Sequence, residues 1–178
     1  MTENLVMLTV RGRFRGVTGG FTGVASDARS WRFTAAVLAD SIDTGLRWRD
    51  ALMRSRHVLN ASRYPVIAFD RGRIEGDVWG VMRVRGDLTL CGVTREVALL
   101  ASYEGRSADP HGGDRLHYSA TGRIDTHEFN VPARTMLRLE GVTGDTGVWL
   151  TFEVELVRPR AGAGATKMQI KRVITAES

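Results

Sequence analysis

The sequence predicts an all-β fold in which short antiparallel strands form a sandwich or a barrel, together with a single helix. Three observations support this fold class. Apolar and polar residues alternate along most of the chain, turn-forming residues separate the alternating segments, and one arginine-rich segment instead has helical periodicity. The chain has 178 residues, of which 43% are hydrophobic and 25% charged, as is typical of one globular domain.

Alternation of period two defines the expected strands. In the last of them, every second residue from Val148 to Leu156 is apolar, whereas polar residues predominate between them. Turns such as Glu75-Gly76-Asp77 and Cys91-Gly92 separate neighbouring strands. One face of the sheet is therefore expected to form the core and the other to face solvent. The expected strands are residues 31–39, 66–74, 79–90, 95–103, 116–124 and 147–157.

One amphipathic helix is expected at about residues 46–60. Thr44 can cap its start, Asn60 can end it, and Tyr64-Pro65 stops any continuation. The apolar stripe of this helix needs an apolar partner, and the open end of a barrel would supply one. The arginines of the segment lie off the stripe and are expected to face water. The stripe consists of Trp48, Leu52, Ser55 and Leu59.

Composition restricts the compartment and the partners. Cys91 is the one cysteine, so no disulfide framework can form, and a small buried thiol is expected. The N-terminus lacks a signal-peptide pattern, and no segment approaches the ~20 apolar residues that span a bilayer, so a soluble, cytoplasmic protein is expected. The net charge of +5 is mostly dispersed over the expected strands, as on a solvated surface. Only residues 158–172 concentrate cations, which leaves peripheral contact with an anionic membrane open.

Four stretches match a known family in order. They are SIDTGLRWRDALMRSRHVLNASRYPVIAF (41–69), RVRGDLTLCGVTREVAL (83–99), FNV (129–131) and GDTGVWLTFEVEL (144–156). Over roughly residues 10–157 the chain resembles the YceI-like polyisoprenoid-binding proteins. The resemblance implies a lipocalin-like antiparallel β-barrel whose helix caps one end. It also implies that a long isoprenoid, such as a quinone or a polyprenyl lipid, lies in the lumen.

The chain departs from the family pattern in two places. Residues 125–130 read Asp-Thr-His-Glu-Phe-Asn where the family usually has Asn-Arg-x-x-Phe-Gly, so any contact made by that arginine is in doubt. The opening strand of the family is also not found. We expect residues 1–157 to form the barrel domain and 158–178 a C-terminal extension. In that extension, a strand at 167–175, from this chain or from a partner's, would close the barrel; the alternative is a disordered basic tail.

An apolar lumen holds a lipid without any catalytic group, because each buried methylene contributes about 0.8 kcal/mol. The expected function is therefore the binding or carriage of an apolar small molecule or lipid, with no cofactor. Some wall residues would instead merely fill a core if no ligand were bound. Pairing of two barrels into a homodimer stays open. The residues expected to contact the ligand are Phe33, Trp48, Leu52, Leu59, Phe69, Met82, Val84, Leu88, Tyr118, Leu150 and Phe152.

The sequence gives less support to two other classes of function. The lumen could be a reaction chamber for cyclisation or isomerisation of a polyene or polyketide-like substrate, with Tyr118, Asp125 or Glu140 as acid or base. A nucleic-acid-binding barrel would need exposed aromatic residues interleaved with cations, and this pattern is not found. No metal site is expected, because His117 and His127 would lie ~30 Å apart on one extended strand. The sequence contains none of the HExxH, CxxC or GxSxG motifs.

Overall fold

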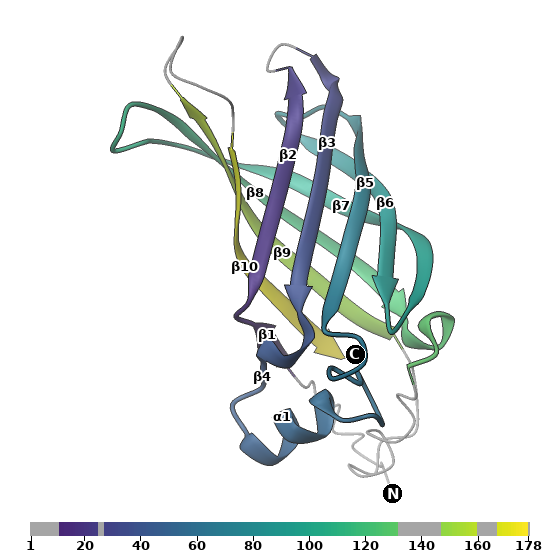
Figure 1. Cartoon of the computed structure of the whole chain (residues 1–178). Coiled ribbons are helices and arrows are strands. Elements are labelled where there is room, and N and C mark those ends of the chain that lie inside the picture. Colours follow the sequence, from purple (N-terminus) through teal and green to yellow (C-terminus); the bar gives the residue numbers. More distant parts are fainter. Residues whose placement is uncertain (1–10, 25–26, 132–146, 160–166, 178) are drawn as a thin grey trace, which may run out of the picture.

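In the computed structural model, the described residues form ten strands in a single sheet that curls around an apolar interior, with a short helix at one end (Figure 1). The structure describes residues 11–24, 27–131, 147–159 and 167–177. The strands are β1 (Arg11–Phe14), β2 (Val17–Val24), β3 (Asp27–Leu38), β4 (Ile42–Asp43), β5 (Val66–Gly76), β6 (Val81–Leu90), β7 (Val93–Ala108), β8 (Gly113–Asp125), β9 (Gly147–Pro159) and β10 (Lys167–Glu177). The helices are α1 (Arg47–Arg54) and the 3₁₀ helices η1 (Ala39–Ser41) and η2 (Thr126–Phe129).

The strands follow the order β2-β3-β5-β6-β7-β8-β9-β10-β1-β4, and the pairs are antiparallel. The sheet curls until β2 lies beside β10, so the architecture is a half-barrel (Figure 1). Bulges assist this curvature, because an extra residue in one strand bends it and increases its twist. In β5 the register to β6 shifts between Asp70 and Arg73, and Arg71 has a φ of 54°. The predicted antiparallel barrel with one capping helix is confirmed.

The C-terminal segment contributes a full strand. β10 pairs with β9 from Lys167 opposite Val157 to Glu177 opposite Val148. Its other edge pairs with β1, where Arg11 lies opposite Ala176. The strand expected at 167–175 therefore exists, runs antiparallel to β9 within the same chain, and is two residues longer than expected.

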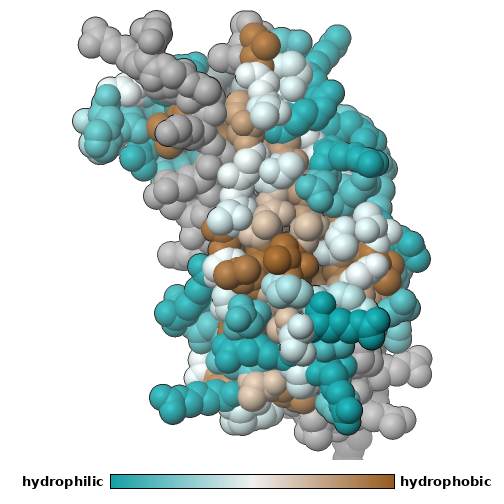
Figure 2. Space-filling model, viewed as in Figure 1, coloured by the Kyte–Doolittle hydropathy of each residue, from teal (hydrophilic) through white to brown (hydrophobic). Residues whose placement is uncertain are grey.

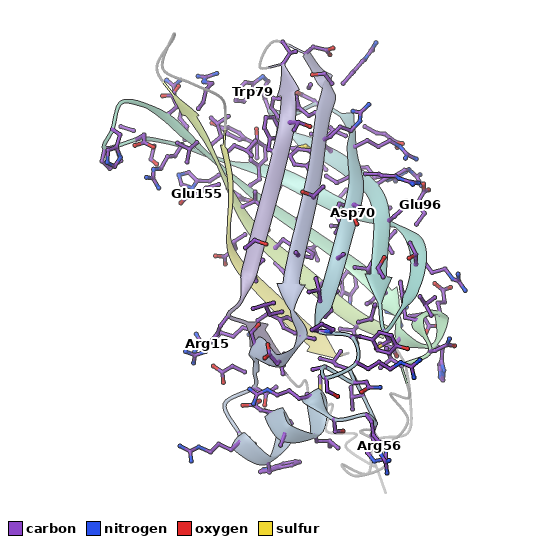
Figure 3. All side chains as sticks on the ribbon, in the orientation of Figure 1. Arg15, Arg56, Asp70, Trp79, Glu96 and Glu155 are labelled. Carbon is purple, nitrogen blue, oxygen red and sulfur yellow. The ribbon has the colours of Figure 1, made fainter. Side chains whose placement is uncertain are left out.

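The two faces of the sheet differ as the alternation predicts. Inward residues of β6 and β9, such as Met82, Leu88 and Leu156, are buried. The outer face carries ion pairs, including Arg71 with Asp87 at 3.2 Å and others between Arg73, Arg85, Glu75 and Glu96. Such exposed pairs contribute little to stability individually, but they keep this face solvated. Figure 3 shows Glu96 on the outside of the sheet, and Figure 2 shows hydrophilic groups over much of the visible surface.

The helical segment is shorter than predicted. α1 ends at Arg54, and Ser55 has an extended backbone with φ −67° and ψ 166°. The Ser55 hydroxyl donates to the Leu52 carbonyl at 2.7 Å and accepts from the His57 amide at 3.2 Å, so the serine side chain takes over bonds that would otherwise continue the helix. Turns follow as far as Tyr64, and Asn60 adopts a left-handed φ of 47°. Because the helix ends early, Trp48 and Leu59 do not share one helical face.

Hydrogen bonds fasten α1 to the preceding segment. Asp50 is buried, and its carboxylate accepts from the Thr44 hydroxyl at 2.6 Å and from the Thr44 amide at 2.7 Å. Thr44 therefore binds a side chain one turn into the helix and does not cap the helix start, where Leu46 is the N-cap residue. Arg49 donates to the Thr44 carbonyl and Arg54 to the Ile42 carbonyl, each at 2.8 Å. Both arginines were expected to face water: Arg54 is exposed and also donates within the fold, whereas Arg49 is half-buried.

The departure from the family pattern at residues 125–130 has a local explanation. The Asp125 side chain accepts a hydrogen bond from the His127 amide and caps η2. Asn130 follows with a left-handed φ of 55°, which asparagine tolerates better than most other residues except glycine. Asparagine can therefore stand where the family pattern has glycine. Phe129, between them, is fully buried.

Candidate ligand cavity

Two apolar cavities lie inside the curled sheet. The first, called here the helix-side cavity, has a volume of about 100 Å³ and is lined by the α1 region as well as by strands. The second, called the far cavity, has a volume of about 80 Å³ and is lined by strands alone. The alternation of inward and outward residues along β9 explains its part in both linings. Its inward residues from Val148 to Leu156 line one cavity or the other.

The two cavities adjoin at three shared lining residues, a region called here the waist. Ala35, Phe69 and Phe152 line both. The Phe69 ring lies against two glycines: a Cβ on Gly72 would come within 2.7 Å of the ring, and a Cβ on Gly86 would overlap it. Glycine at these positions therefore makes room for the ring. Because Ala35 presents only a methyl group at the waist, it is the smallest of the three side chains that separate the cavities.

The helix-side cavity is closed by the segment around α1. Met53, Val58 and Leu59 contribute apolar atoms, and Thr44 and Thr126 add polar ones. Val58 and Leu59 are buried although they lie in the turns after α1. The Cys91 thiol donates to the Leu59 carbonyl at 3.4 Å, which holds this turn against the β6–β7 hairpin. Burial raises the pKa of Cys91, as expected for a structural thiol and unlike a nucleophile.

The far cavity is rich in aromatic residues. Trp31 and Phe33 on β3 pack against each other and against Phe21 on β2. On the opposite wall, the ring of Tyr118 lies 5.5 Å from that of Tyr103. Tyr118 is 8% exposed, and its hydroxyl has no hydrogen-bond partner among the residues that the structure describes. Burial raises the pKa of Tyr118 to about 12, with a smaller contribution from Tyr103, so the phenol is neutral at physiological pH.

The structure brings together most of the residues predicted to contact a ligand. Phe69 and Phe152 lie at the waist. Trp48 and Leu52 lie outside both linings: Leu52 is half-buried against the core, and Trp48 is 57% exposed because α1 directs it to solvent. The helix-side cavity contains Leu59, Leu88 and Leu150, and the far cavity contains Phe33, Met82, Val84 and Tyr118.

Other lining residues were not predicted. Leu99 on β7 follows the alternation and could have been found by extending the parity argument to that strand. Phe14 on β1 and Val131 after η2 lie in segments without a long alternating pattern, so only the three-dimensional pairing of these segments identifies them. Val58 belonged to the expected helix but was off its predicted stripe.

The two described groups suggested for acid–base chemistry, Tyr118 and Asp125, do not line a common cavity. The Asp125 carboxylate caps η2 and is not a lining residue of either cavity. Glu140 lies outside the described residues. Of the two that the structure describes, Tyr118 lines a cavity, and its raised pKa makes it a poor base near neutrality. Within the described ranges, no helix is both long enough and apolar enough to cross a bilayer.

The chain is similar to solved structures over most of its length. It superposes on the YceI protein of Campylobacter jejuni with a TM-score of 0.75, at 21% identity, over 90% of this chain and 91% of that one. BcnA of Burkholderia cenocepacia gives a TM-score of 0.65 at 14% identity, over 96% and 94% of the two chains. A polyisoprenoid-binding domain from Saccharophagus degradans gives 0.53 at 14% identity, over 96% and 99%. At these identities the likeness concerns the fold.

Sequence comparison identifies the family. Protein YceI of Escherichia coli O157:H7 is 33% identical over 120 residues, which are 67% of this chain and 62% of that protein. A UPF0312 protein of Vibrio vulnificus is 29% identical over 69% of this chain and 65% of its own length. The matched region thus spans slightly less than two thirds of these relatives. The YceI-like domain model matches residues 2–158, beginning before the expected residue 10 and ending before β10. The chain therefore belongs to the YceI-like domain family.

Proposed function

We propose that this protein binds and carries a long apolar ligand, such as an isoprenoid, a quinone or another lipid, inside the curled sheet. The observation that carries the proposal is the pair of apolar cavities that meet at Ala35, Phe69 and Phe152. Membership of the YceI-like family supports it, as does the likeness to a Saccharophagus degradans domain described as polyisoprenoid-binding.

The dimensions favour a slim chain. Each cavity is smaller than the roughly 300–1,000 Å³ typical of pockets for compact drug-sized ligands. A flexible hydrocarbon can occupy two small cavities in succession if it passes the waist. Each methylene moved from water into such walls contributes about 0.8 kcal/mol, so a chain of several isoprene units needs no charged anchor. Tyr118 is neutral and Asp125 is engaged at η2, and both facts favour carriage over a reaction chamber.

We further propose that the α1 end contacts an anionic membrane during ligand exchange. Leu46 and Trp48 are 44% and 57% exposed, and Arg47 between them and Arg56 after α1 are exposed as well. Tryptophan and leucine insert at a lipid interface, while arginines attract anionic headgroups. The helix-side cavity lies behind this surface, so a ligand leaving the membrane here would have the shortest path to the lumen.

Blocking the waist tests ligand binding. In Ala35→Phe, a ring would fill the space shared by the two cavities, while Ala36→Phe places the same ring on the opposite face of β3. The purified protein would first be extracted with organic solvent, and the extract analysed by mass spectrometry. The delipidated protein would then be titrated with a fluorescent polyene lipid.

We expect Ala35→Phe to weaken polyene binding at least tenfold, because excluding two or three methylenes costs about 2 kcal/mol. Ala36→Phe should bind like the wild type. Equal affinities of wild type and Ala35→Phe would contradict a lumenal site, as would the failure of the delipidated wild type to bind any chain.

A further inference from the structure

The distal part of the β2–β3 hairpin is joined to the rest of the sheet on neither edge. The β3–β5 ladder stops at Phe33, opposite Gly72. β2 lies beside β10, but among the strands that the structure describes no ladder joins these two. Residues 22–24 and 27–32, called here the distal hairpin, therefore pair only with each other, at the end of the sheet remote from α1 (Figure 1).

Side-chain contacts hold the distal hairpin together internally. The Trp31 indole donates to the Val24 carbonyl at 3.0 Å, and the Ser30 hydroxyl accepts from the Val24 amide at 2.8 Å. The Trp31 ring also packs edge-on against Phe21, at 5.4 Å, and lies near Phe33. Because these contacts lie within one hairpin, the distal hairpin can move as a unit without breaking them.

A chain of several isoprene units needs more space than the two cavities offer. Their volumes are about 100 and 80 Å³, whereas an apolar cavity of roughly 150 Å³ holds a single benzene molecule. The lumen therefore has to widen when such a chain binds. Because protein interiors are close-packed and hardly compressible, the additional space has to come from the movement of a wall.

We propose that the distal hairpin is the movable wall of the far cavity and swings away from β5 and β10 to admit the ligand. The inference rests on the proposed lipid-binding function and deepens it by naming the part of the site that moves. Trp31, which lines the far cavity and is 6% exposed, would move with the hairpin.

The other walls of the far cavity are less free to separate. Ladders join the neighbouring strands from β5 to β9, so parting any two of them would break backbone hydrogen bonds. Movement of the distal hairpin breaks no ladder. It removes apolar contacts of the Trp31 ring, and the hydrocarbon of the ligand would replace those contacts.

A reversible crosslink between β3 and β5 tests the movement. Arg32 and Arg73 are exposed and lie one position beyond the last pair of the β3–β5 ladder. Arg32→Cys and Arg73→Cys would be combined and bridged with a bifunctional maleimide that contains a disulfide. This linker ties the distal hairpin to β5, and a reductant releases it.

The matched control is the same linker at the other end of the ladder. Leu38 and Val66 are exposed and lie opposite each other as a pair of the β3–β5 ladder, so Leu38→Cys and Val66→Cys tie two strands that are already joined. Both pairs would be made with Cys91→Ala, which removes the native thiol outside both cavity linings. Each delipidated protein is titrated with the fluorescent polyene lipid before crosslinking, after it, and after reduction.

We expect the crosslink between Arg32→Cys and Arg73→Cys to weaken polyene binding at least tenfold, because each methylene excluded from the lumen lowers affinity about fourfold. Reduction of the linker should restore the affinity, which shows that the fold is intact. The crosslink between Leu38→Cys and Val66→Cys should leave the affinity unchanged.

A distance measurement provides a second test. Spin labels on Thr22→Cys and Leu100→Cys, both at exposed positions, report the separation of the distal hairpin from β7. This distance should lengthen when the polyene binds. The distance between labels on Leu38→Cys and Leu100→Cys should stay constant, because ladders connect β3 to β7 at this level.

Three results would overturn the inference: unchanged polyene affinity after crosslinking of the distal hairpin, an equal loss with both crosslinks, or a distance between the labels at Thr22→Cys and Leu100→Cys that the polyene does not alter. In each of these cases the uncrosslinked protein still binds the polyene, so lipid binding stands. Failure of the delipidated wild type to bind the polyene would instead overturn the proposed function and this inference together.

Discussion

The two cavities differ in what holds their walls. The far cavity is lined entirely by strands, whose inward residues are placed by the hydrogen-bonded ladders from β3 to β9. The helix-side cavity is closed partly by α1 and its turns, which are fastened by individual contacts from Thr44 to Asp50, Arg54 to Ile42 and Cys91 to Leu59. A ladder fixes many residues cooperatively, whereas each of these contacts can be broken singly. The comparison indicates that the walls of the far cavity from β5 to β9 are rigid, whereas the α1 side of the helix-side cavity is easier to perturb.

The largest expected effect is at the waist, where the two cavities meet. Phe152→Ala would remove a ring that is 9% exposed and would join the cavities into one void. We expect the free energy of unfolding to fall by about 3–5 kcal/mol, as in other buried Phe→Ala substitutions. Urea denaturation monitored by tryptophan fluorescence measures this change. A loss below about 1 kcal/mol would indicate that the ring is not packed between the cavities.

A smaller effect is expected where glycine makes room for Phe69. In Gly86→Ala the new methyl group would overlap the Phe69 ring, and such overpacking costs about 1–3 kcal/mol. Gly80→Ala is the matched control, because a Cβ there meets only the Asp77 carboxylate at an ordinary 3.6 Å. The two variants would be compared by urea denaturation. Equal stabilities would show that the Phe69 ring can move aside without cost.

Much of the far cavity could be predicted from the sequence. Period-two alternation in β6 and β9 places Met82, Val84 and Phe152 on the inner face, and the structure has them there. The alternation works because a strand residue and its second neighbour must share a face whatever the rest of the chain does. Which residues line the far cavity is therefore largely set by the local alternation within each strand, and can be predicted from the sequence.

The helix end could be predicted only in part. The helical periodicity was found, but the hydrogen bonds of Ser55 end α1 at Arg54, and the placement of Trp48 and Leu59 changes with that one boundary. The pairing of β1 with β10, which brings Phe14 to the helix-side cavity, joins segments far apart in the sequence. No local pattern encodes such a pairing. The polar contact of Thr44 with Asp50 likewise depends on where the helix begins.

The contact between Thr44 and Asp50 should make the stability of the fold depend on pH in the acid range. The hydrogen bonds from Thr44 hold the pKa of Asp50 below its usual value, so this carboxylate stabilises the fold above pH ~4, and the contribution is lost as pH falls through the lowered pKa. Thr44→Val removes the hydroxyl donor and should lower stability at pH 7 by about 1 kcal/mol. The difference from wild type should narrow in acid, where Asp50 is protonated in both proteins.

Urea denaturation of both proteins between pH 7 and pH 2 measures this difference. Thr22→Val, at an exposed position on β2, is the control and should follow the wild type throughout. A stability difference between Thr44→Val and wild type that stays constant down to pH 2 would exclude Asp50 as its source.

The smallest effect on stability is expected for substitution of Trp48. Comparing this substitution at the α1 end with one at the opposite end of the sheet nevertheless tests the proposed function. Trp48 is 57% exposed and outside both cavities, so Trp48→Ala should change the free energy of unfolding by less than about 0.5 kcal/mol. Trp79, 54% exposed at the opposite end, is the matched control, although its ring also packs against Tyr103.

If the α1 end contacts the membrane, co-sedimentation with vesicles containing phosphatidylserine should fall several-fold in Trp48→Ala and stay unchanged in Trp79→Ala. Added salt should weaken binding of the wild type, because exposed arginines beside Trp48 supply part of the attraction. Equal losses in the two variants would mean that tryptophan binds lipid without regard to its place in the fold. In that case the helix end would have no special role in delivering a ligand to the lumen.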